Sequence, residues 1–359
     1  MSSPGNFQAG AFIAVCQDGE GWEDIFYLSG FFGTSGALVV TPEDSVLFVD
    51  SRYIELAGET CACKFMSCAT CGQLTPMRAA VAYATGCKPE RVAFGGRKLT
   101  YSSYRELYSL FGGNIKLVDY SNVLMNMRRR KSYEETVKIR EAIDVATRAF
   151  AAALAETSEG VTERNFAATL EYMARTGGGD FANLVPVIVS SGVRTSMPHA
   201  PPTEKKFERG DLVMADFCVR RGGYVCDITR MFSIGEPSHE ICSLYSLVRW
   251  AQEEAAALVA PGRAARELDA ASREVMEGAS LGDYFTHGLG HGIGVSVHEM
   301  PSINQFSNAL LTEGDVITLE PGFYKPGWGG MRVEDDYLVT KTGAVRLTDT
   351  LSRELFVVG

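Results

Sequence analysis

Two stretches of the sequence place pairs of acidic residues on segments that predict β-hairpins. The first contains Asp216 and Asp227, with Gly222 and Gly223 between them. Glycine supplies the positive φ that tight hairpin turns need. With the turn centred between Arg221 and Gly222, we expect Asp216 and Asp227 to face each other across the hairpin.

Directly opposed side chains on such a hairpin have Cβ atoms about 4.5–5.5 Å apart, and like charges there are destabilising. The flanking residues are mostly apolar, which predicts that both carboxylates are buried. Two buried carboxylates in contact need a shared proton or a cation, and a divalent cation is the simplest solution. Any one of these acids taken alone has a second interpretation, a solvated residue on a strand.

A second hairpin repeats this arrangement with two glutamates. A loop centred on Gly327 would place Glu320 opposite Glu334. The Pro321-Gly322 dipeptide allows for a β-bulge that would shift this register. Two acid pairs on two hairpins favour a common site over four independent surface carboxylates.

Three of the five histidines fall close together, at His287, His291 and His298. Glycines alternate along the segment between the first two, and glycine disfavours a helix. The helical pair of histidines found in many zinc proteases is therefore not expected, and we predict a strand or extended loop. A single histidine is often only a hydrogen-bonded core residue, but three together indicate a site.

Imidazole and carboxylate donors without a thiolate suit Mn, Zn, Co or Fe better than Ca or Mg alone. One histidine and four acids are enough for two ions about 3.5–4 Å apart, the spacing of hydrolytic two-metal centres. Such a pair lowers the pKa of a water between the ions and polarises a carbonyl. The residues therefore predict hydrolysis.

The length and net charge of the chain limit the number of domains and the kinds of partner that the sequence predicts. The chain has 359 residues, which favours two domains, and its net charge of −10 argues against nucleic acid or an anionic membrane surface as a partner. We expect an α/β domain over residues 1–125 and a catalytic domain over residues 126–359. No signal peptide or transmembrane segment is recognisable, and nine cysteines without such a signal predict reduced thiols and a cytoplasmic location.

Helices and strands alternate in the order expected for these two domains. Ser132 and Glu135 form a capping box at the start of a predicted helix. The predicted helices span residues 133–156, 163–175, 238–258 and 264–277, and strands are expected at 36–41, 45–50, 185–235 and 285–359. Two helix pairs, each followed by strands, predict an α/β (α+β) fold with a curved antiparallel sheet covered by helices.

Four cysteines, Cys61, Cys63, Cys68 and Cys71, form a separate cluster. One interpretation is a structural zinc site or a redox pair. The other is that Cys61 and Cys63 lie on one face of a strand as packing residues.

The ordered acids and histidines resemble the pita-bread metallopeptidases, the family of methionine aminopeptidase, aminopeptidase P and prolidase. Asp227-Ile-Thr-Arg230 is similar to the family's DxTR segment, and His287 to Gly294 to its HGxGHGxG segment. Glu320-Pro-Gly322 resembles its EPG segment and Arg332 to Asp335 its RxED segment. Three features resemble the Xaa-Pro peptidase branch of the family. They are the creatinase-like N-terminal segments around Tyr27 and Asp50, the linker from Arg130 to Arg140, and the Met197-Pro-His199 segment.

The resemblance implies a role for each site residue. Asp216 would bind one ion, Asp227 and Glu334 would bridge both, and His291 and Glu320 would hold the other. Glu320 would move a proton from the water between the ions to the leaving nitrogen, and His298 would stabilise the oxyanion. His199 and His287 would line the proline side, while Arg332 and Tyr324 would orient the ligands. The ions would be manganese, with cobalt, zinc or iron as alternatives, the substrate a proline-containing peptide, and the assembly a homodimer.

Two departures from the family pattern bear on specificity. Cys218 stands where the family has glycine, at a position that binds no metal. Ser302 stands where some prolidases carry an arginine that holds the free carboxylate of a dipeptide, so both an aminopeptidase and a dipeptidase remain open. A lyase or amidinohydrolase on the same fold, and a non-catalytic peptide-binding module, are the alternative functions.

Overall fold

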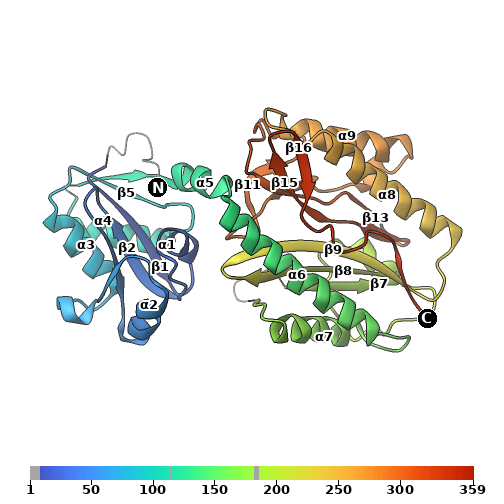
Figure 1. The fold of residues 1–359 in the computed structure, drawn as a ribbon, viewed down its shortest axis with the longest axis horizontal. Helices are drawn as coiled ribbons and strands as arrows, with labels where there is room; N and C mark the ends of the chain where they lie inside the picture. Colours follow the sequence, from blue (N-terminus) through green and yellow to red (C-terminus); the bar gives the residue numbers. More distant parts are fainter. Residues whose placement is uncertain (1–8, 114, 182–185) are drawn as a thin grey trace. The chain divides into compact units, whose positions relative to one another are not determined.

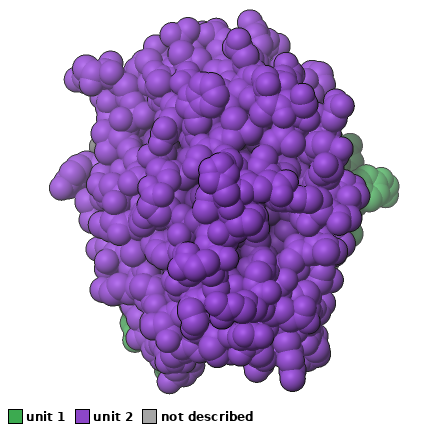
Figure 2. Space-filling model, turned by 90° about the vertical axis from the view of Figure 1, so that its right-hand side faces the viewer, with its two compact units in different colours: residues 1–128 green, residues 129–359 purple. Residues whose placement is uncertain are grey.

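The structure is a computed structural model that describes residues 9–113, 115–181 and 186–359 (Figure 1). It divides into two compact units, Met1–Arg128 and Arg129–Gly359, which Figure 2 colours separately. The first eight residues, where we expect no signal peptide, and residue 185, where we expect strands to begin, lie outside the described residues. Within the described ranges, no helix is long and apolar enough to cross a membrane.

The first unit is built on a six-stranded sheet in the order β4-β3-β2-β1-β5-β6, in which only β2 runs against its neighbours. Its strands are β1 (Ala11–Gln17), β2 (Ser35–Val40), β3 (Ser45–Val49), β4 (Lys64–Ser67), β5 (Arg91–Phe94) and β6 (Lys116–Asp119). The helices are α1 (Trp22–Ser29), α2 (Ile54–Thr60), α3 (Pro76–Gly86), α4 (Tyr101–Leu110) and α5 (Ser121–Arg129). The central strands are buried apolar runs, as expected when helices cover a sheet.

The cysteine cluster of this unit differs from the interpretation as packing residues on one strand and from that as a structural zinc site. Cys61 ends α2 and Cys63 precedes β4, so the prediction that they share one face of a strand is wrong. The helix runs to Thr60, and only three residues remain before the strand begins. The two sulfurs lie 3.4 Å apart. Cys68 and Cys71 do not join them in a four-thiol site, because the described residues contain no metal-ligating cluster with a cysteine.

The second unit holds two larger sheets, each covered by a helix pair (Figure 1), and a two-stranded sheet, β13-β14; the pairing is antiparallel except between β17 and β9. Helices α6 (Tyr133–Ala155) and α7 (Glu163–Thr176) pack on the sheet β17-β9-β8-β7, and α8 (His239–Ala257) and α9 (Ala265–Gly278) pack on the sheet β11-β10-β12-β15-β16. The strands are β7 (Ile188–Ser191), β8 (Leu212–Arg221), β9 (Tyr224–Ile234), β10 (Gly290–Gly292), β11 (Glu299–Ile303), β12 (Val316–Leu319), β13 (Gly322–Lys325), β14 (Gly329–Arg332), β15 (Asp335–Thr340), β16 (Gly343–Arg346) and β17 (Phe356–Val358). The four helices match their predicted ranges to within one residue at each end, and the helix-covered sheet is confirmed.

The register of the first hairpin, β8–β9, is not the predicted one. Arg221 pairs with Tyr224, so Asp216 faces Thr229 and Asp227 faces Cys218. The physical reason is that both turn glycines adopt left-handed conformations, with φ of 56° and 84°, and together form the two-residue turn. Asp216 and Asp227 are therefore diagonal neighbours on one face and not directly opposed.

The register of the second hairpin is the predicted one. β12 pairs with β15 and β13 pairs with β14 in a single alignment, with Leu319 opposite Asp335 and Gly322 opposite Arg332. The proline and glycine after Glu320 interrupt the pairing without shifting it. Glu320 and Glu334 lie in this interruption, between the paired segments.

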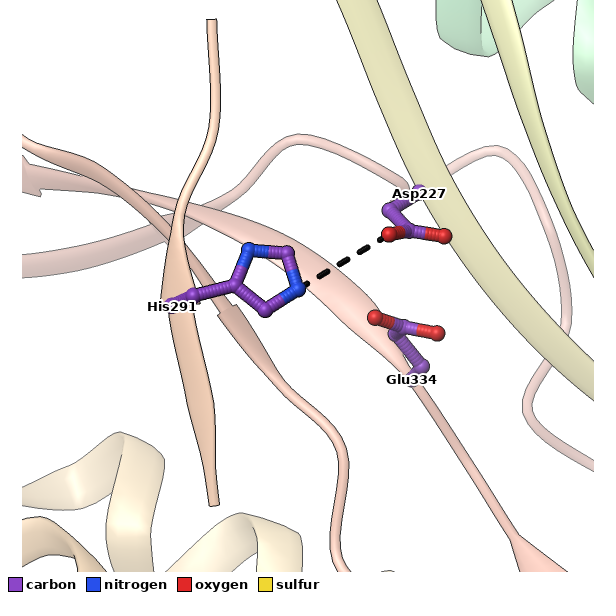
Figure 3. A group of neighbouring side chains, drawn as sticks. All are labelled: Asp227, His291 and Glu334. Carbon is purple, nitrogen blue, oxygen red and sulfur yellow. Dashed lines mark ion pairs between the residues drawn. The ribbon is translucent and has the colours of Figure 1, made fainter. Parts of the chain in front are cut away.

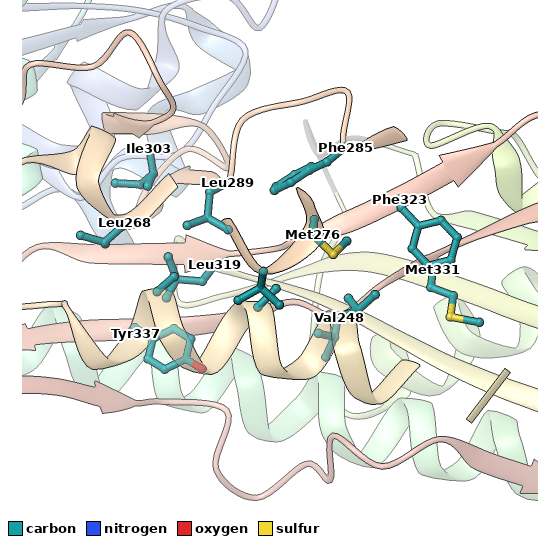
Figure 4. Packing of buried hydrophobic residues seen from close by; sticks show 14 of the residues in the cluster. Val248, Leu268, Met276, Phe285, Leu289, Ile303, Leu319, Phe323, Met331 and Tyr337 are labelled. Atoms are coloured by element: carbon teal, nitrogen blue, oxygen red, sulfur yellow. The ribbon is translucent and has the colours of Figure 1, made fainter. Parts of the chain in front are cut away.

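An apolar cluster holds α8 and α9 against these strands (Figure 4). Val248 of α8 and Met276 of α9 are fully buried there together with Leu319 of β12. Because neighbouring residues on a strand point to opposite faces, burial of Leu319 under the helices turns the next side chain, Glu320, the other way. The core thus determines the direction of a site residue.

The capping box at the start of α6 is confirmed and yields a stability prediction. The Ser132 hydroxyl accepts from the backbone of Glu135 at 3.3 Å, and the Ser132 backbone donates to the Glu135 carboxylate at 2.7 Å. We expect Ser132→Ala to lower the free energy of unfolding by about 1 kcal/mol, because a helix N–H loses its acceptor. Urea denaturation measures the free energy of unfolding, and Ser158→Ala, at an exposed position, is the control. Equal stability of the two variants would contradict the role of the cap.

Candidate metal centre

A cavity of about 590 Å³ in the second unit brings the predicted site residues together. Its wall includes all nine of the predicted ligands and catalytic residues: His199, Asp216, Asp227, His287, His291, His298, Glu320, Arg332 and Glu334. These residues come from separate strands and loops, so the site forms only when the two sheets meet. That meeting point is an isolated bridge between Thr229 and Glu334.

Three of these side chains converge most closely (Figure 3). One ligand atom from each of Asp227, His291 and Glu334 lies within 4.8 Å of the others. The His291 Nε2 atom is 3.8 Å from Asp227 Oδ2 and 3.4 Å from Glu320 Oε1. An imidazole thus faces carboxylates from both hairpins.

The hydrogen bonds of His291 define which nitrogen faces these carboxylates. Its Nδ1 lies 3.0 Å from the carbonyl oxygen of Gly292, and a carbonyl can only accept, so Nδ1 donates. Burial, with His298 adding to the effect, lowers the pKa of His291 to about 4, so the ring is neutral and Nε2 carries a lone pair. A lone pair directed at carboxylates is favourable when a cation lies between them or when a carboxyl group is protonated and donates to it.

The carboxylates themselves are unfavourable as bare anions in this cavity. Burial, then repulsion from Asp216, raises the pKa of Asp227 well above its usual value. Burial, then repulsion from Asp227, does the same for Glu334. Burial raises the pKa of Glu320 to about 8; Arg332 opposes this rise and Asp216 adds to it. Without a cation, protons must therefore neutralise part of this cluster.

A chain of hydrogen bonds runs through one wall of the cavity. The buried Arg332 guanidinium forms an ion pair with Asp216 and donates to the Tyr324 hydroxyl at 2.6 Å. That hydroxyl lies 2.9 Å from His287 Nε2, and His287 Nδ1 lies 2.7 Å from the Gly288 carbonyl. Since the carbonyl accepts from Nδ1, Nε2 accepts from the tyrosine. Burial, with Arg332 adding to it, lowers the pKa of His287 to about 3, which matches this neutral form.

Two residues in contact with the ligands were not anticipated from the sequence. The Thr229 hydroxyl donates to Glu334 Oε2 at 2.7 Å and accepts from Arg332 Nε at 3.0 Å. Its spacing of two residues from Asp227 on a strand was a usable signal, since such residues share a face. The Cys218 thiol donates to Asp227 Oδ1 at 3.1 Å, a contact that depends on the hairpin register.

The remaining predicted residues complete the wall around this cluster. The His298 and His291 rings are T-shaped, with centroids 4.5 Å apart. His199 lines the cavity, as do Ser302 and Asn304. The donor set of four carboxylates and one imidazole, without a thiolate, fits divalent transition-metal ions.

Comparison with known proteins agrees with this site. The family model described as "Metallopeptidase family M24" matches residues 137–341, and "Creatinase/Prolidase N-terminal domain" matches residues 9–130. The Xaa-Pro dipeptidase of Pyrococcus horikoshii is 35% identical over 334 residues, 92% of each chain, and that of Pyrococcus furiosus is 42% identical over 65% of this chain and 67% of its own. The crystal structure of X-Pro aminopeptidase from Thermotoga maritima MSB8 superposes with a TM-score of 0.90 at 32% identity, covering 98% of both chains.

The residues matched by the two family models lie in both units of the fold. The alignments with the relatives that cover nearly the whole chain also include both units. The M24 match contains every residue of the carboxylate and histidine cluster. The chain therefore belongs to metallopeptidase family M24 and carries the N-terminal domain of creatinases and prolidases.

Proposed function

We propose that this chain is a metal-dependent peptidase that hydrolyses the bond between an N-terminal residue and a following proline. The observation that supports this most is the convergence of Asp227, His291 and Glu334 with a further carboxylate on either side. Relatives that cover nearly the whole chain are named Xaa-Pro dipeptidase and X-Pro aminopeptidase, which supports the proline specificity.

In this proposal two divalent ions, most simply Mn²⁺, occupy the cluster. Asp216 would hold one ion, Asp227 and Glu334 would be shared by both, and His291 and Glu320 would hold the other. The oxygen and nitrogen donors support manganese, with cobalt, zinc and iron as alternatives. When bound, the ions supply Lewis-acid polarisation of the scissile carbonyl and make water more acidic.

The chain's own groups then perform the proton transfers. Glu320 takes a proton from the attacking water and delivers it to the proline nitrogen as the bond breaks, a role supported by its readiness to hold a proton in the buried cavity. His298, beside His291, donates a hydrogen bond to the oxygen of the tetrahedral intermediate. Arg332 holds Asp216 and Tyr324 in place through its three nitrogens.

The proline side of the substrate lies against His199 and His287. Both line the cavity, and His287 is fixed as a neutral ring by the tyrosine and the carbonyl described above. A neutral ring with both nitrogens engaged presents a flat, largely apolar surface. Such a surface suits a pyrrolidine ring better than a charged side chain.

We further propose that the enzyme prefers tripeptides and longer peptides over dipeptides. Within the described wall of the cavity, Arg332 is the one lysine or arginine, and its nitrogens donate to Thr229, Tyr324 and Asp216. The residues outside the described ranges contain neither lysine nor arginine. The free carboxylate of a dipeptide therefore finds no available side-chain cation on this wall, whereas a longer peptide presents an amide there. The names of the dipeptidase relatives favour the other specificity, so the substrate panel below tests both.

The proposal also includes an oligomeric state and a cellular location. We propose a homodimer in the cytoplasm. The nine cysteines are all free in the structure, which supports a reducing compartment. The dimer rests on the family resemblance.

A peptide panel tests the specificity. With Mn²⁺ present, we expect Ala-Pro-Ala to be cleaved with a kcat/KM about tenfold or more above that of Ala-Pro, because the dipeptide carboxylate is uncompensated, a difference of about 1.4 kcal/mol. Ala-Ala-Ala should be cleaved slowly or not at all. Preference for Ala-Pro would establish the dipeptidase alternative, and cleavage of Ala-Ala-Ala alone would refute proline specificity.

Removal of a shared ligand tests the centre itself. We expect Asp227→Ala to abolish turnover and to reduce the bound metal, because the proposal places this carboxylate on both ions. Elemental analysis and peptide hydrolysis measure the two effects. Asp283→Ala, at an exposed position in the same unit, is the control and should behave as wild type. Turnover by Asp227→Ala at the rate of the control would overturn the ligand assignment.

The raised pKa values predict how stability depends on pH. A carboxyl group whose folded-state pKa is raised favours folding at low pH, and this contribution is lost as pH rises through the folded-state value. For Glu320 this window runs from 4.5 to about 8, and the raised pKa values of Asp227 and Glu334 act in the same direction. We expect the melting temperature of chelator-treated protein to fall between about pH 6.5 and pH 8, above the range in which the lowered pKa values of His287 and His291 act in the opposite direction.

Saturating Mn²⁺ should remove most of this fall, because the ions replace the protons as neutralising charge. Scanning calorimetry at matched pH values, with and without metal, measures the difference. A metal-free melting temperature that stays level or rises over this range, relative to the metal-loaded protein, would contradict the electrostatic account.

A further inference from the structure

The two site glutamates lie where the pairing of their strands is interrupted. The ladder stops at Leu319 opposite Asp335 and resumes at Gly322 opposite Arg332. In the gap, one backbone hydrogen bond still joins the strands, from Val333 N–H to Pro321 O at 3.4 Å, but the two glutamate N–H groups have other partners. The Glu320 N–H donates to Leu289 O at 2.8 Å, and the Glu334 N–H donates to Thr229 O at 3.3 Å.

The consequence is that the two strands part at the site. Glu320 joins the chain that leads to the histidine strand β10, and Glu334 joins the aspartate strand β9. This divergence opens room for the cavity between the carboxylates, and the carbonyls on its two sides accept hydrogen bonds from outside the ladder. Buried carbonyls need a donor from elsewhere.

The side chain of Gln252 in α8 supplies that donor. It is fully buried, an unusual place for an amide unless it is hydrogen-bonded. Its Nε2 donates to Leu319 O at 2.9 Å and to Asp335 Oδ2 at 3.1 Å, and it lies 3.5 Å from Val333 O. These acceptors directly precede Glu320 and flank Glu334 on both sides.

The amide is itself held in one orientation. Arg353 Nη1 donates to Gln252 Oε1 at 3.0 Å, so the NH₂ group must face the strands. From β9, the buried Arg230 donates to Glu334 O and to Asp335 Oδ1, each at 2.6 Å. The Asp335 carboxylate therefore receives the helix amide on one oxygen and the strand guanidinium on the other.

We infer that Gln252 is a positioning residue that sets the separation of the Glu320 and Glu334 carboxylates by joining their two backbones across the interrupted ladder. The inference rests on the proposed function, in which both carboxylates bind the metal ions. Gln252 itself contacts neither carboxylate. It acts through the backbone carbonyl before one ligand and the side chain after the other.

The geometry explains why an amide is required. A leucine or methionine of similar size would fill the space but would remove the hydrogen bonds to Leu319 O and Asp335 Oδ2 and the acceptor of Arg353 Nη1. A glutamate would accept but not donate, and would place a second anion against Asp335. Partners that orient metal ligands change metal affinity or activity by about 10–100-fold when they are removed.

The test compares metal binding in two variants of the same helix. Gln252→Met removes the hydrogen bonds, and Val248→Ala, one turn earlier and also fully buried, weakens the core without touching the interruption. Calorimetric titration of Mn²⁺ into metal-free protein gives the dissociation constants. Melting temperatures of the metal-free forms report stability, and kcat and KM are measured at saturating metal.

We expect Gln252→Met to weaken metal binding by about 10–100-fold and to lower kcat with little change in KM, while Val248→Ala keeps wild-type affinity despite a lower melting temperature. Wild-type affinity in Gln252→Met, or an equal loss in both variants, would overturn the inference. If Gln252→Met does not fold, Arg353→Met, which frees the amide to rotate and also removes a half-exposed ion pair with Glu253, should weaken binding severalfold. Glu253→Gln, which removes that ion pair alone, should keep wild-type affinity, and wild-type affinity in Arg353→Met would also overturn the inference. Wild-type protein that binds no Mn²⁺ would instead refute the proposed function, and the inference with it.

Discussion

The mutual repulsion of four carboxylates in one buried cavity is the constraint on which the second unit depends. Asp216, Asp227, Glu320 and Glu334 come from two hairpins and share a wall with a single guanidinium. Taking such charges out of water is unfavourable unless they are protonated or paired with cations. Burial raises the carboxyl pKa values and, together with His298, lowers the pKa of His291, so the imidazole is neutral and does not offset the repulsion between the carboxylates.

The fold accommodates this excess of buried negative charge with polar contacts on both sides of the strands, one set facing the cavity and one set behind it. On the cavity side, the described groups that donate to the ligand carboxylates are the hydroxyls of Thr229 and Thr318, the Arg332 guanidinium and the Cys218 thiol. Behind the strands, Arg230, Gln252 and Asp335 form a buried network whose hydrogen bonds are satisfied by one another and by backbone carbonyls. This network keeps the backbone fixed while the carboxylates remain available to a cation.

The sequence predicted the parts of this arrangement that have local causes. The α6 helix and its cap follow from Ser132, Glu135 and a periodic apolar stripe, all within one segment. The second hairpin was predicted in the correct register because Gly327 lies at the centre of its loop. The first was misplaced because two adjacent glycines allow more than one closing pair, and only the folded hairpin shows that both belong to the turn. The contact of Cys218 with Asp227 follows from that register. The role of Gln252 can be recognised only in the folded protein, where α8 lies against a strand interruption that is distant in the sequence.

The ligands differ in how well the protein stabilises them as anions. Asp216 has the guanidinium of Arg332, and Glu334 has the hydroxyl of Thr229. Within the described residues, the carboxylate of Asp227 has one hydrogen-bond donor, the weakly donating thiol of Cys218, although Asp227 is almost fully buried. Asp227 therefore gains more from a cation than Asp216 or Glu334 does, because its described hydrogen-bond donor is the weaker one. A glycine at position 218 would remove even that donor, so the cysteine at this position lowers the dependence of Asp227 on metal without replacing it.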